Sequence, residues 1–267
     1  PPDQIDDSFA FGTRQFMTQL RYGDAKLHPQ LVKRAERLYE AEIAYTDGQI
    51  GRLFDGLRAK DVFNDSVIVF TADHGEEFLE HDGFEHGHTL YPELTHVPLV
   101  MRYPSQLTAG RVPQSVGHID VAPTLCELID AAAPKQFVGR SLLPIVSGED
   151  QADRAVLAHG NMWGAPLTSL RTAEHLLILP GTVTGESPVP ELYAWRKDPQ
   201  CMQDLALENA DIVDDMMADL EARESSLEAF GHGSAVKLTP EQAEGLRSLG
   251  YGEAPPPPEN EKADDKK

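Results

Sequence analysis

With 267 residues, the chain is long enough to bury a sizeable core, which indicates one large domain or one domain with an appendage. Its formal net charge of -21 argues against a nucleic-acid or anionic-membrane binder, because phosphate groups and the protein would repel each other. The charge leaves room for an anionic small substrate where a cation or local donors reverse the field. The two cysteines imply no disulfide framework, and no apolar run reaches the length of a membrane span.

The first half of the chain carries the pattern of an α/β layer. Apolar residues at helical spacing predict a long amphipathic helix from Leu31 to about Lys60. SVIVFTA (66–72) indicates a buried strand, and HVPLVMRYP (96–104) indicates a second short strand. Together with the helical pattern that follows, this order favours an α/β fold with a largely parallel sheet.

The second half predicts a helix and then a small antiparallel sheet. HIDVAPTLCELIDAAA (118–133) has the pattern of a helix with Asp120 near its N-cap. Beyond it, AVLAHG, LTSLRT, HLLILP and ELYAW are short strand candidates separated by turn residues. An acidic helical segment follows from about Asp204 to Glu228, and the Pro-rich, charged residues 253–267 are expected to be disordered.

The densest polar stretch is TADHGEEFLEHDGFEHGHTLY (71–91), which holds four of the 10 histidines. Asp73 and His74 follow directly on the predicted strand, and in open α/β sheets the carboxyl ends of strands form the ligand crevice. The pair offers a hard oxygen and an imidazole nitrogen to one divalent cation. The alternative is that Asp73 caps a helix and His74 is an ordinary polar residue. The density of titratable groups favours a site.

Three further histidines of this stretch are candidates for catalysis and binding. His86 and His88 are alternate residues, which point the same way in an extended segment, so both imidazoles are expected to face one pocket. There they can bind an anionic oxygen, protonate a leaving group or ligate a second metal. His81 is a candidate for the same work or for a hydrogen bond that braces the loop. Glu76 and Glu77 are expected to begin a helix and are not selected as ligands.

Outside this stretch the polar residues carry weaker signals. Asp120 and His118 are candidates for a pocket wall, with helix capping as the favoured role for Asp120. Trp163, Arg171 and His175 are candidates for a substrate-facing surface of the small sheet or for packing.

Several stretches of the sequence also resemble motifs of one known family, and they occur in the same order along the chain as in that family. DSVIVFTADHGEEFLEHDGFEHGHTLYPELTHVPLVMRYP (65–104) resembles the second metal-ligand block of the sulfatase family, within the alkaline phosphatase superfamily. HIDVAPTLCELI and GRSLLPIVSGE resemble the stretch after that block, and ELYAWRKDPQCMQDLA is similar to an element of the C-terminal subdomain. LTPEQAEGLRSLGY resembles a frequent ending among bacterial members, so the similarity spans roughly residues 30–252.

The resemblance implies a fold and an activity. The fold is α/β, with the second half of an alkaline-phosphatase-like sheet core over residues 1–150 and a small C-terminal antiparallel subdomain over 151–230. Residues 231–267 form an extension with the disordered tail. The implied activity is hydrolysis of sulfate esters, carried by a small molecule or a carbohydrate. No nucleic acid is expected as a partner.

The resemblance also assigns roles to residues. Asp73 and His74 fall on a pair of ligands for one divalent cation, with calcium expected first and manganese, magnesium or zinc as alternatives. His86 falls where many members place a lysine on the leaving-group side of the ester. His86 and His88 are therefore the expected catalytic residues, and His86 and His81 the expected substrate-binding residues.

Departures from the family pattern keep two other interpretations open. Many sulfatases have Asn where His74 stands, and histidine there is also seen in the phosphonate monoester hydrolase branch. A phosphodiesterase, phosphonate monoester hydrolase or phosphotransferase of the same superfamily is therefore one alternative. A non-catalytic metal-binding or interaction module is the other.

The family's C/S-x-P-x-R nucleophile motif does not occur in the sequence, since Cys126 and Cys201 lack the following Pro and Arg. The formylglycine nucleophile, an aldehyde hydrate derived from Cys or Ser, is therefore expected in a missing N-terminal part, together with the first metal-ligand pair. On this expectation the polypeptide is a fragment that is inactive alone. Export to the periplasm or outside is common in the family, with a signal region in that missing part, and a cytoplasmic location stays open.

Overall fold

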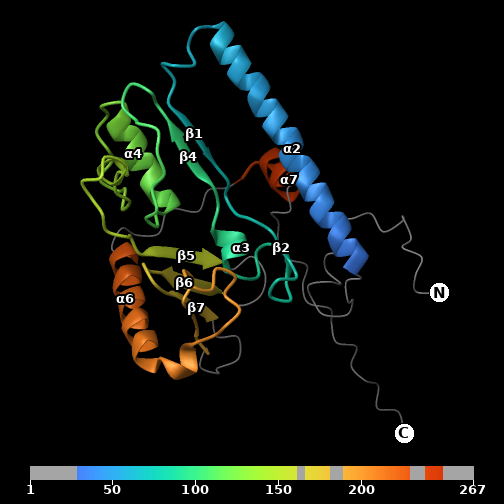
Figure 1. The fold of residues 1–267 in the computed structure, drawn as a ribbon, viewed down its shortest axis with the longest axis vertical. Helices are drawn as coiled ribbons and strands as arrows, with labels where there is room; N and C mark the ends of the chain where they lie inside the picture. Colours follow the sequence, from blue (N-terminus) through green and yellow to red (C-terminus); the bar gives the residue numbers. More distant parts are fainter. Residues whose placement is uncertain (1–28, 161–165, 181–188, 229–237, 249–267) are drawn as a thin grey trace, which may run out of the picture.

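The computed structural model describes residues 29–160, 166–180, 189–228 and 238–248 (Figure 1). The predicted long amphipathic helix is confirmed as α2 (Pro29–Ala59), which runs along one side of the molecule in Figure 1. Val32 and Ala35 near its start are buried, whereas Ile43 and Leu53 of the same apolar stripe are exposed. Helix α2 is therefore held mainly through its first turns among the described residues.

The two predicted strands of the first half form one pair, β1 (Ile68–Thr71) and β4 (Leu99–Arg102). They run antiparallel, so the predicted largely parallel sheet is wrong for these strands. Their connection, residues 72–98, folds back on itself, and its helix α3 (Pro92–Thr95) has only 4 residues, whereas a parallel crossover usually contains a long helix. The prediction of a buried strand is also wrong, because Phe70 in β1 is 43% exposed.

The dense loop between β1 and β4 contains a ribbon of two very short strands. β2 (Glu77–Phe78) and β3 (Phe84–Glu85) pair antiparallel, with Glu77 opposite Glu85. The expectation that Glu76 and Glu77 begin a helix is therefore wrong. The ribbon folds the loop back on itself and brings residues on either side of it together.

The predicted helix after β4 is present as the short 3-10 helix η1 (His118–Asp120) followed by α4 (Val121–Leu128). Asp120 stands at the N-cap of α4 but makes no side-chain capping bond there. Its buried carboxylate instead accepts a hydrogen bond from the backbone N–H of Arg140 at 2.8 Å and pairs with Arg154 Nη1 at 3.2 Å. Asp120 thus ties α4 to the segment that leads into the small sheet, by way of α5 (Leu143–Val146).

The predicted small antiparallel sheet is confirmed as four strands in the order β5-β6-β7-β8. The strands are β5 (Val156–Gly160), β6 (Leu167–Arg171), β7 (Leu176–Pro180) and β8 (Glu191–Tyr193). One face packs against α6 (Ala210–Glu228), the predicted acidic helix, which begins after the 3-10 helix η2 (Ala206–Glu208). The shared core consists of Leu170, Leu177, Leu192, Val213, Met216 and Leu220.

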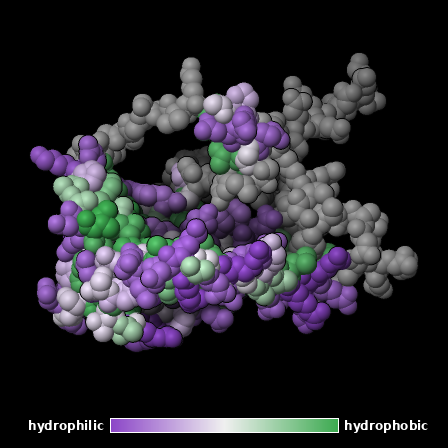
Figure 2. All heavy atoms as spheres, turned by 90° about the horizontal axis from the view of Figure 1, so that it is seen from above, coloured by the Kyte–Doolittle hydropathy of each residue, from purple (hydrophilic) through white to green (hydrophobic). Residues whose placement is uncertain are grey.

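The last described element is α7 (Pro240–Ser248), which lies within the predicted extension. The predicted disordered tail, 253–267, lies outside the described residues. In the described part of the chain, none of the helices combines the length and the apolar character that crossing a membrane requires. Hydrophobic residues reach the surface in patches among hydrophilic ones (Figure 2), and exposed examples are Val100, Ile119 and Ile129.

The core between the small sheet and α6 makes a stability prediction. Leu177 is 0% exposed, so Leu177→Ala leaves a cavity and is expected to lower the free energy of unfolding by about 3 kcal/mol. Leu207 is 97% exposed, and Leu207→Ala, the same chemical change, is expected to cost less than about 0.5 kcal/mol. Urea unfolding followed by circular dichroism measures both. Equal effects of the two substitutions would show that this core is assigned wrongly.

Candidate active site

The dense loop is organised around the carboxylate of Glu77, which is 0% exposed. Its Oε1 accepts hydrogen bonds from the backbone N–H groups of His81 at 3.0 Å and Gly83 at 2.8 Å. Its Oε2 accepts one from the Thr89 hydroxyl at 2.9 Å and lies 3.3 Å from His88 Nε2. A single buried carboxylate therefore joins the near and far ends of the loop.

These partners decide the charge of Glu77. Burial alone raises the pKa of a carboxyl, but the nearby His88 imidazole and the hydrogen bonds from Thr89 and Gly83 together outweigh burial here, so the pKa of Glu77 is lowered from its ordinary 4.5. Glu77 is therefore ionised at neutral pH. A buried negative charge with this many donors stabilises one loop conformation and disfavours others that leave it without partners.

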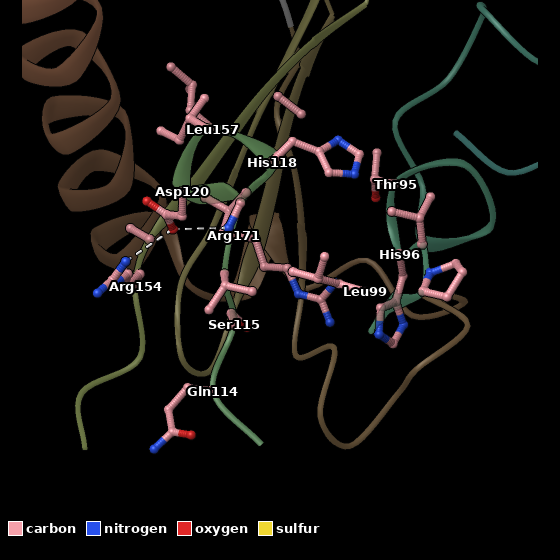
Figure 3. A pocket seen from close by; sticks show the side chains of 18 of the residues that line it. Thr95, His96, Leu99, Gln114, Ser115, His118, Asp120, Arg154, Leu157 and Arg171 are labelled. Atoms are coloured by element: carbon pink, nitrogen blue, oxygen red, sulfur yellow. Dashed lines mark hydrogen bonds and ion pairs between the residues drawn. The ribbon is translucent and has the colours of Figure 1, made fainter. Parts of the chain in front are cut away.

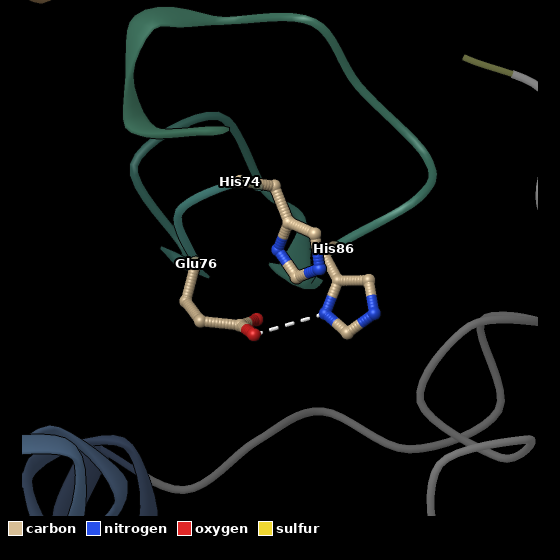
Figure 4. A group of neighbouring side chains, drawn as sticks. All are labelled: His74, Glu76 and His86. Carbon is tan, nitrogen blue, oxygen red and sulfur yellow. Dashed lines mark hydrogen bonds and ion pairs between the residues drawn. The ribbon is translucent and has the colours of Figure 1, made fainter. Parts of the chain in front are cut away.

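The ribbon brings together three side chains that sequence reasoning did not join: His74, Glu76 and His86 (Figure 4). Because Glu77 pairs with Glu85, the residues just outside the ribbon, Glu76 and His86, become neighbours across it. His86 Nδ1 lies 2.9 Å from Glu76 Oε1, and the rings of His74 and His86 have centroids 4.0 Å apart. One nitrogen or oxygen of each residue lies within 4.8 Å of the others, which is the spacing of ligands around a single metal ion.

Asp73 and His74 stand at the end of β1, as predicted. The Asp73 side chain is 77% exposed, and its Oδ2 lies 3.6 Å from His74 Nε2. His74 Nδ1 donates to the carbonyl of Gly75 at 2.9 Å, which leaves the lone pair of the neutral ring on Nε2. Gly75 is required at this turn, since a Cβ there would lie 1.9 Å from the backbone oxygen of Glu93. The close approach of the loop to α3 thus fixes the His74 ring.

The predicted shared orientation of His86 and His88 does not occur. Gly87 between them has a φ of 86°, so the segment is not extended and the alternation of side chains is broken. His86 lines the main hollow with His74, whereas His88 turns toward Glu77. The structure therefore places one of the two predicted catalytic histidines at the hollow and the other behind it.

His81 makes contacts that hold the 71–91 loop in place, one of the two roles considered from the sequence. Its ring stacks on Tyr91 with centroids 3.6 Å apart, and its Nε2 lies 3.2 Å from the carbonyl oxygen of Cys201. Tyr91 in turn donates to Glu191 of β8 at 2.7 Å. His81 thus fastens the loop to the C-terminal subdomain. Burial raises the pKa of the Cys201 thiol to about 12, so this cysteine is protonated at neutral pH.

The site opens into a hollow of about 1370 Å³ between the loop and the C-terminal subdomain. Asp73, His74 and His86 line it on the loop side. The wall drawn in Figure 3 comes from other elements, and its polar members include Thr95, His96, Ser115, His118, Asp120, Arg154 and Arg171. The hollow is thus built by two parts of the chain far apart in sequence, and concave sites of this kind are where ligands usually bind.

Two polar contacts connect residues along the wall of the hollow. The hydroxyl of Thr71, the last residue of β1, lies 3.0 Å from His118 Nε2. The Asp120–Arg154 ion pair lies further along the same wall (Figure 3). Both His118 and Asp120 therefore line the hollow, the role that the sequence left as the less favoured alternative for Asp120.

Comparison with known families agrees with these features. The family model described as Sulfatase matches residues 2–131, and the one described as N-sulphoglucosamine sulphohydrolase, C-terminal, matches residues 80–226. The second match covers more than half of the chain. The chain belongs to the sulfatase family.

Curated relatives match the chain over part of their length. Arylsulfatase K of Mus musculus is 28% identical over 192 residues, which are 68% of this chain and 34% of the relative. The N-acetylglucosamine-6-O-sulfatase of Bacteroides thetaiotaomicron is 29% identical over 152 residues, which are 55% of this chain and 27% of the relative. The chain thus spans about a third of the length of these relatives.

Solved structures share the fold. BT4656, solved in complex with its substrate D-glucosamine-2-N,6-O-disulfate, is 26% identical with a TM-score of 0.64, over 81% of this chain and 46% of that one. The phosphonate monoester hydrolase of Agrobacterium radiobacter is 25% identical with a TM-score of 0.57, over 75% of this chain and 43% of that one. The predicted alkaline-phosphatase-like α/β fold is confirmed.

The buried carboxylate makes a prediction about acid stability. Glu77→Gln replaces an ionised acceptor by an amide whose N–H₂ faces donors, so it is expected to cost about 3 kcal/mol of stability at pH 7. Because the pKa of Glu77 is lowered on folding, its ionisation contributes stability above pH 4.5, and this contribution is lost as the pH falls through the folded-state value.

The difference between wild type and Glu77→Gln is therefore expected to shrink as the pH falls below 4.5. Chemical unfolding at a series of pH values measures it. Glu42→Gln on the exposed face of α2 is the matched control and is expected to leave stability nearly unchanged at every pH. A difference for Glu77→Gln that stays constant with pH would contradict an ionised Glu77.

Proposed function

We propose that this chain supplies the Asp73–His74 half of a divalent-cation site in an enzyme that hydrolyses sulfate esters of a carbohydrate. The observation that carries the proposal is the convergence of His74, Glu76 and His86 after the end of β1, where His74 and His86 line the hollow. Membership of the sulfatase family supports sulfate ester hydrolysis as the reaction class.

The residues present fit a divalent cation. Asp73 or Glu76 offers carboxylate oxygens, and His74 and His86 offer imidazole nitrogens. The ligand atoms of His74, Glu76 and His86 lie within 4.8 Å of one another. A cation bound there supplies Lewis-acid polarisation of the ester oxygens. Calcium prefers oxygen ligands, so two imidazoles favour manganese or zinc at the three-residue group, while calcium would rely on Asp73 and Glu76.

The chain's own residues orient and transfer protons. Glu76 accepts the Nδ1–H of His86, which fixes the ring and leaves the lone pair of the neutral ring on Nε2. This Nε2 would bind the cation where His86 is a ligand, and would hold a proton toward a leaving oxygen where Asp73, His74 and Glu76 bind the cation without it. For His88 and His81 we propose positioning, because His88 faces the buried Glu77 and His81 stacks on Tyr91. Both hold the loop that presents His74 and His86.

The proposed substrate is a sulfated amino sugar. The similarity to the N-acetylglucosamine-6-O-sulfatase of Bacteroides thetaiotaomicron and to BT4656 supports this class. Hydrolysis of a phosphonate monoester is the second candidate, supported by the likeness to the phosphonate monoester hydrolase of Agrobacterium radiobacter. Sulfate and phosphonate groups are both tetrahedral, so the described residues serve either.

The cation site makes a prediction about metal affinity. His74→Ala removes an imidazole ligand and is expected to weaken manganese binding at least about 10-fold, as loss of a ligand does. Isothermal titration calorimetry with manganese, zinc and calcium measures the affinity and orders the three metals. His175→Ala, in the turn between β6 and β7 and outside the hollow, is the control and is expected to leave the affinity unchanged. Equal affinities of wild type and His74→Ala would reject the site.

The missing nucleophile motif makes a prediction about turnover. The 267 residues contain no C/S-x-P-x-R motif, so this polypeptide alone is expected to release no sulfate from glucosamine 6-sulfate. The protein expressed from the whole reading frame that carries this sequence is expected to release it, measured by ion chromatography. Hydrolysis of a phosphonate monoester but not of the sulfate ester would favour the second candidate. Turnover by the 267 residues alone would contradict the proposed dependence on that nucleophile.

A further inference from the structure

The C-terminal side of the hollow carries a cationic group apart from the candidate cation site. Arg171 ends β6, and Trp195 and Arg196 follow β8. All three line the hollow that Asp73 and His74 also line. The guanidinium carbons of Arg171 and Arg196 lie 3.7 Å and 4.5 Å from the centroid of the Trp195 ring, which is the range of cation–π contacts.

The two guanidinium groups differ in their partners. Arg196 Nη2 lies 3.0 Å from each carboxylate oxygen of Asp153, so its charge is compensated by a salt bridge. Among the residues that the structure describes, Arg171 has its ring contact with Trp195 but no hydrogen bond or ion pair, and its Nε is buried without a partner. Among the described residues, one guanidinium of this wall therefore has no direct anionic partner.

The surroundings of Arg171 make that charge costly. Burial is the largest cause that lowers the pKa of Arg171, and the like charge of Arg196 adds to the effect, while Cys201 and Asp153 oppose it without reversing it. Burial also lowers the pKa of His96 beside it, with the charge of Arg171 adding to that shift, so His96 is neutral at pH 7. The chain has a net charge of -21, yet among the described residues no carboxylate forms an ion pair with this guanidinium, and the nearby Asp153 is paired with Arg196. An external anion would recover the desolvation energy.

The position is also prepared in advance. The Trp195 indole N–H donates to the carbonyl of Thr172 at 3.0 Å, which fixes the ring on which Arg171 rests. Figure 3 shows the Arg171 side chain extending along the wall toward His96. A guanidinium held against a fixed ring keeps its fork of N–H donors in one plane, which matches the paired oxygens of a sulfate or a carboxylate.

We propose that Arg171, supported by Trp195, is a specificity subsite for a second anionic group, sulfate or carboxylate, on the carbohydrate whose sulfate ester lies at the His74–Glu76–His86 group. This inference rests on the proposed function and deepens it, because it states that the substrate carries at least two negative charges. The subsite contributes binding energy away from the reacting ester, and it selects among sulfated sugars.

Calorimetric binding to the protein expressed from the whole reading frame tests the subsite. The ligands are glucosamine 6-sulfate, glucosamine 2-N,6-O-disulfate, and glucosamine 6-sulfate linked to a uronic acid. Wild type is expected to bind at least one doubly charged ligand about 10-fold or more tightly than the singly charged one. Arg171→Ala is expected to abolish that difference with little change for the singly charged ligand. Whether the disulfate or the uronate ligand loses affinity identifies the second group as sulfate or carboxylate.

Two further variants sharpen the experiment. Arg171→Lys keeps the charge without the planar fork and is expected to retain part of the difference. Arg52→Ala, which removes a positive charge from the exposed face of α2, is expected to change none of the affinities. Thermal unfolding establishes that each variant is folded, and Arg171→Lys serves as the test if Arg171→Ala is not.

Two outcomes would overturn the subsite. They are equal affinities of wild type for singly and doubly charged ligands, and an equal loss for both ligand types in the Arg171 variants. Sulfate release by wild type, measured separately, tests the proposed hydrolysis. A protein that releases no sulfate but shows the Arg171-dependent difference keeps the subsite and loses the hydrolysis. A protein that releases sulfate without that difference keeps the hydrolysis and loses the subsite.

Discussion

The candidate site depends on one buried negative charge, the carboxylate of Glu77. It accepts hydrogen bonds from His81 and Gly83 in the middle of the 71–91 loop and from Thr89 near its far end, and it is 0% exposed. Opening the loop would therefore leave that charge without its donors. The ribbon that Glu77 helps to form has a register in which Glu76 and His86 are neighbours. The convergence of a carboxylate and two imidazoles is therefore a consequence of how the loop is closed.

The two sides of the hollow have different charges. The loop side presents carboxylates and imidazoles that suit a cation, and the subdomain side presents Arg171 and Arg196 against Trp195. A strongly acidic protein thus places local positive charge where an anionic ligand would lie, which offsets the repulsion expected from a net charge of -21. His81 joins the two sides through Tyr91 and Cys201, so the loop and the small sheet form one wall.

Local patterns predicted the elements well and their pairing poorly. Helix α2 was predicted from the helical spacing of its apolar residues, and the four short strands of the small sheet were predicted from their composition and the turn residues between them. The antiparallel pairing of β1 with β4 was not, because it depends on how the long loop between them folds back, which the pattern of the strands themselves does not determine. Glu76 was missed for a related reason: its partnership with His86 follows from the two-residue ribbon, which periodicity does not reveal at that length. Gly87 has a φ of 86°, so the His86 and His88 side chains point in different directions. The glycine between the two histidines was the sequence signal that the segment need not be extended.

The central claim is that the loop closed by Glu77 holds His74, Glu76 and His86 around one divalent cation, with Asp73 beside them. Anomalous diffraction from crystals of the chain grown with manganese tests it most directly. The account predicts one strong anomalous peak within coordination distance of His74 Nε2 and of a carboxylate oxygen of Asp73 or Glu76. A peak elsewhere with none at this position, or a His74 ring turned out of the hollow, would contradict it.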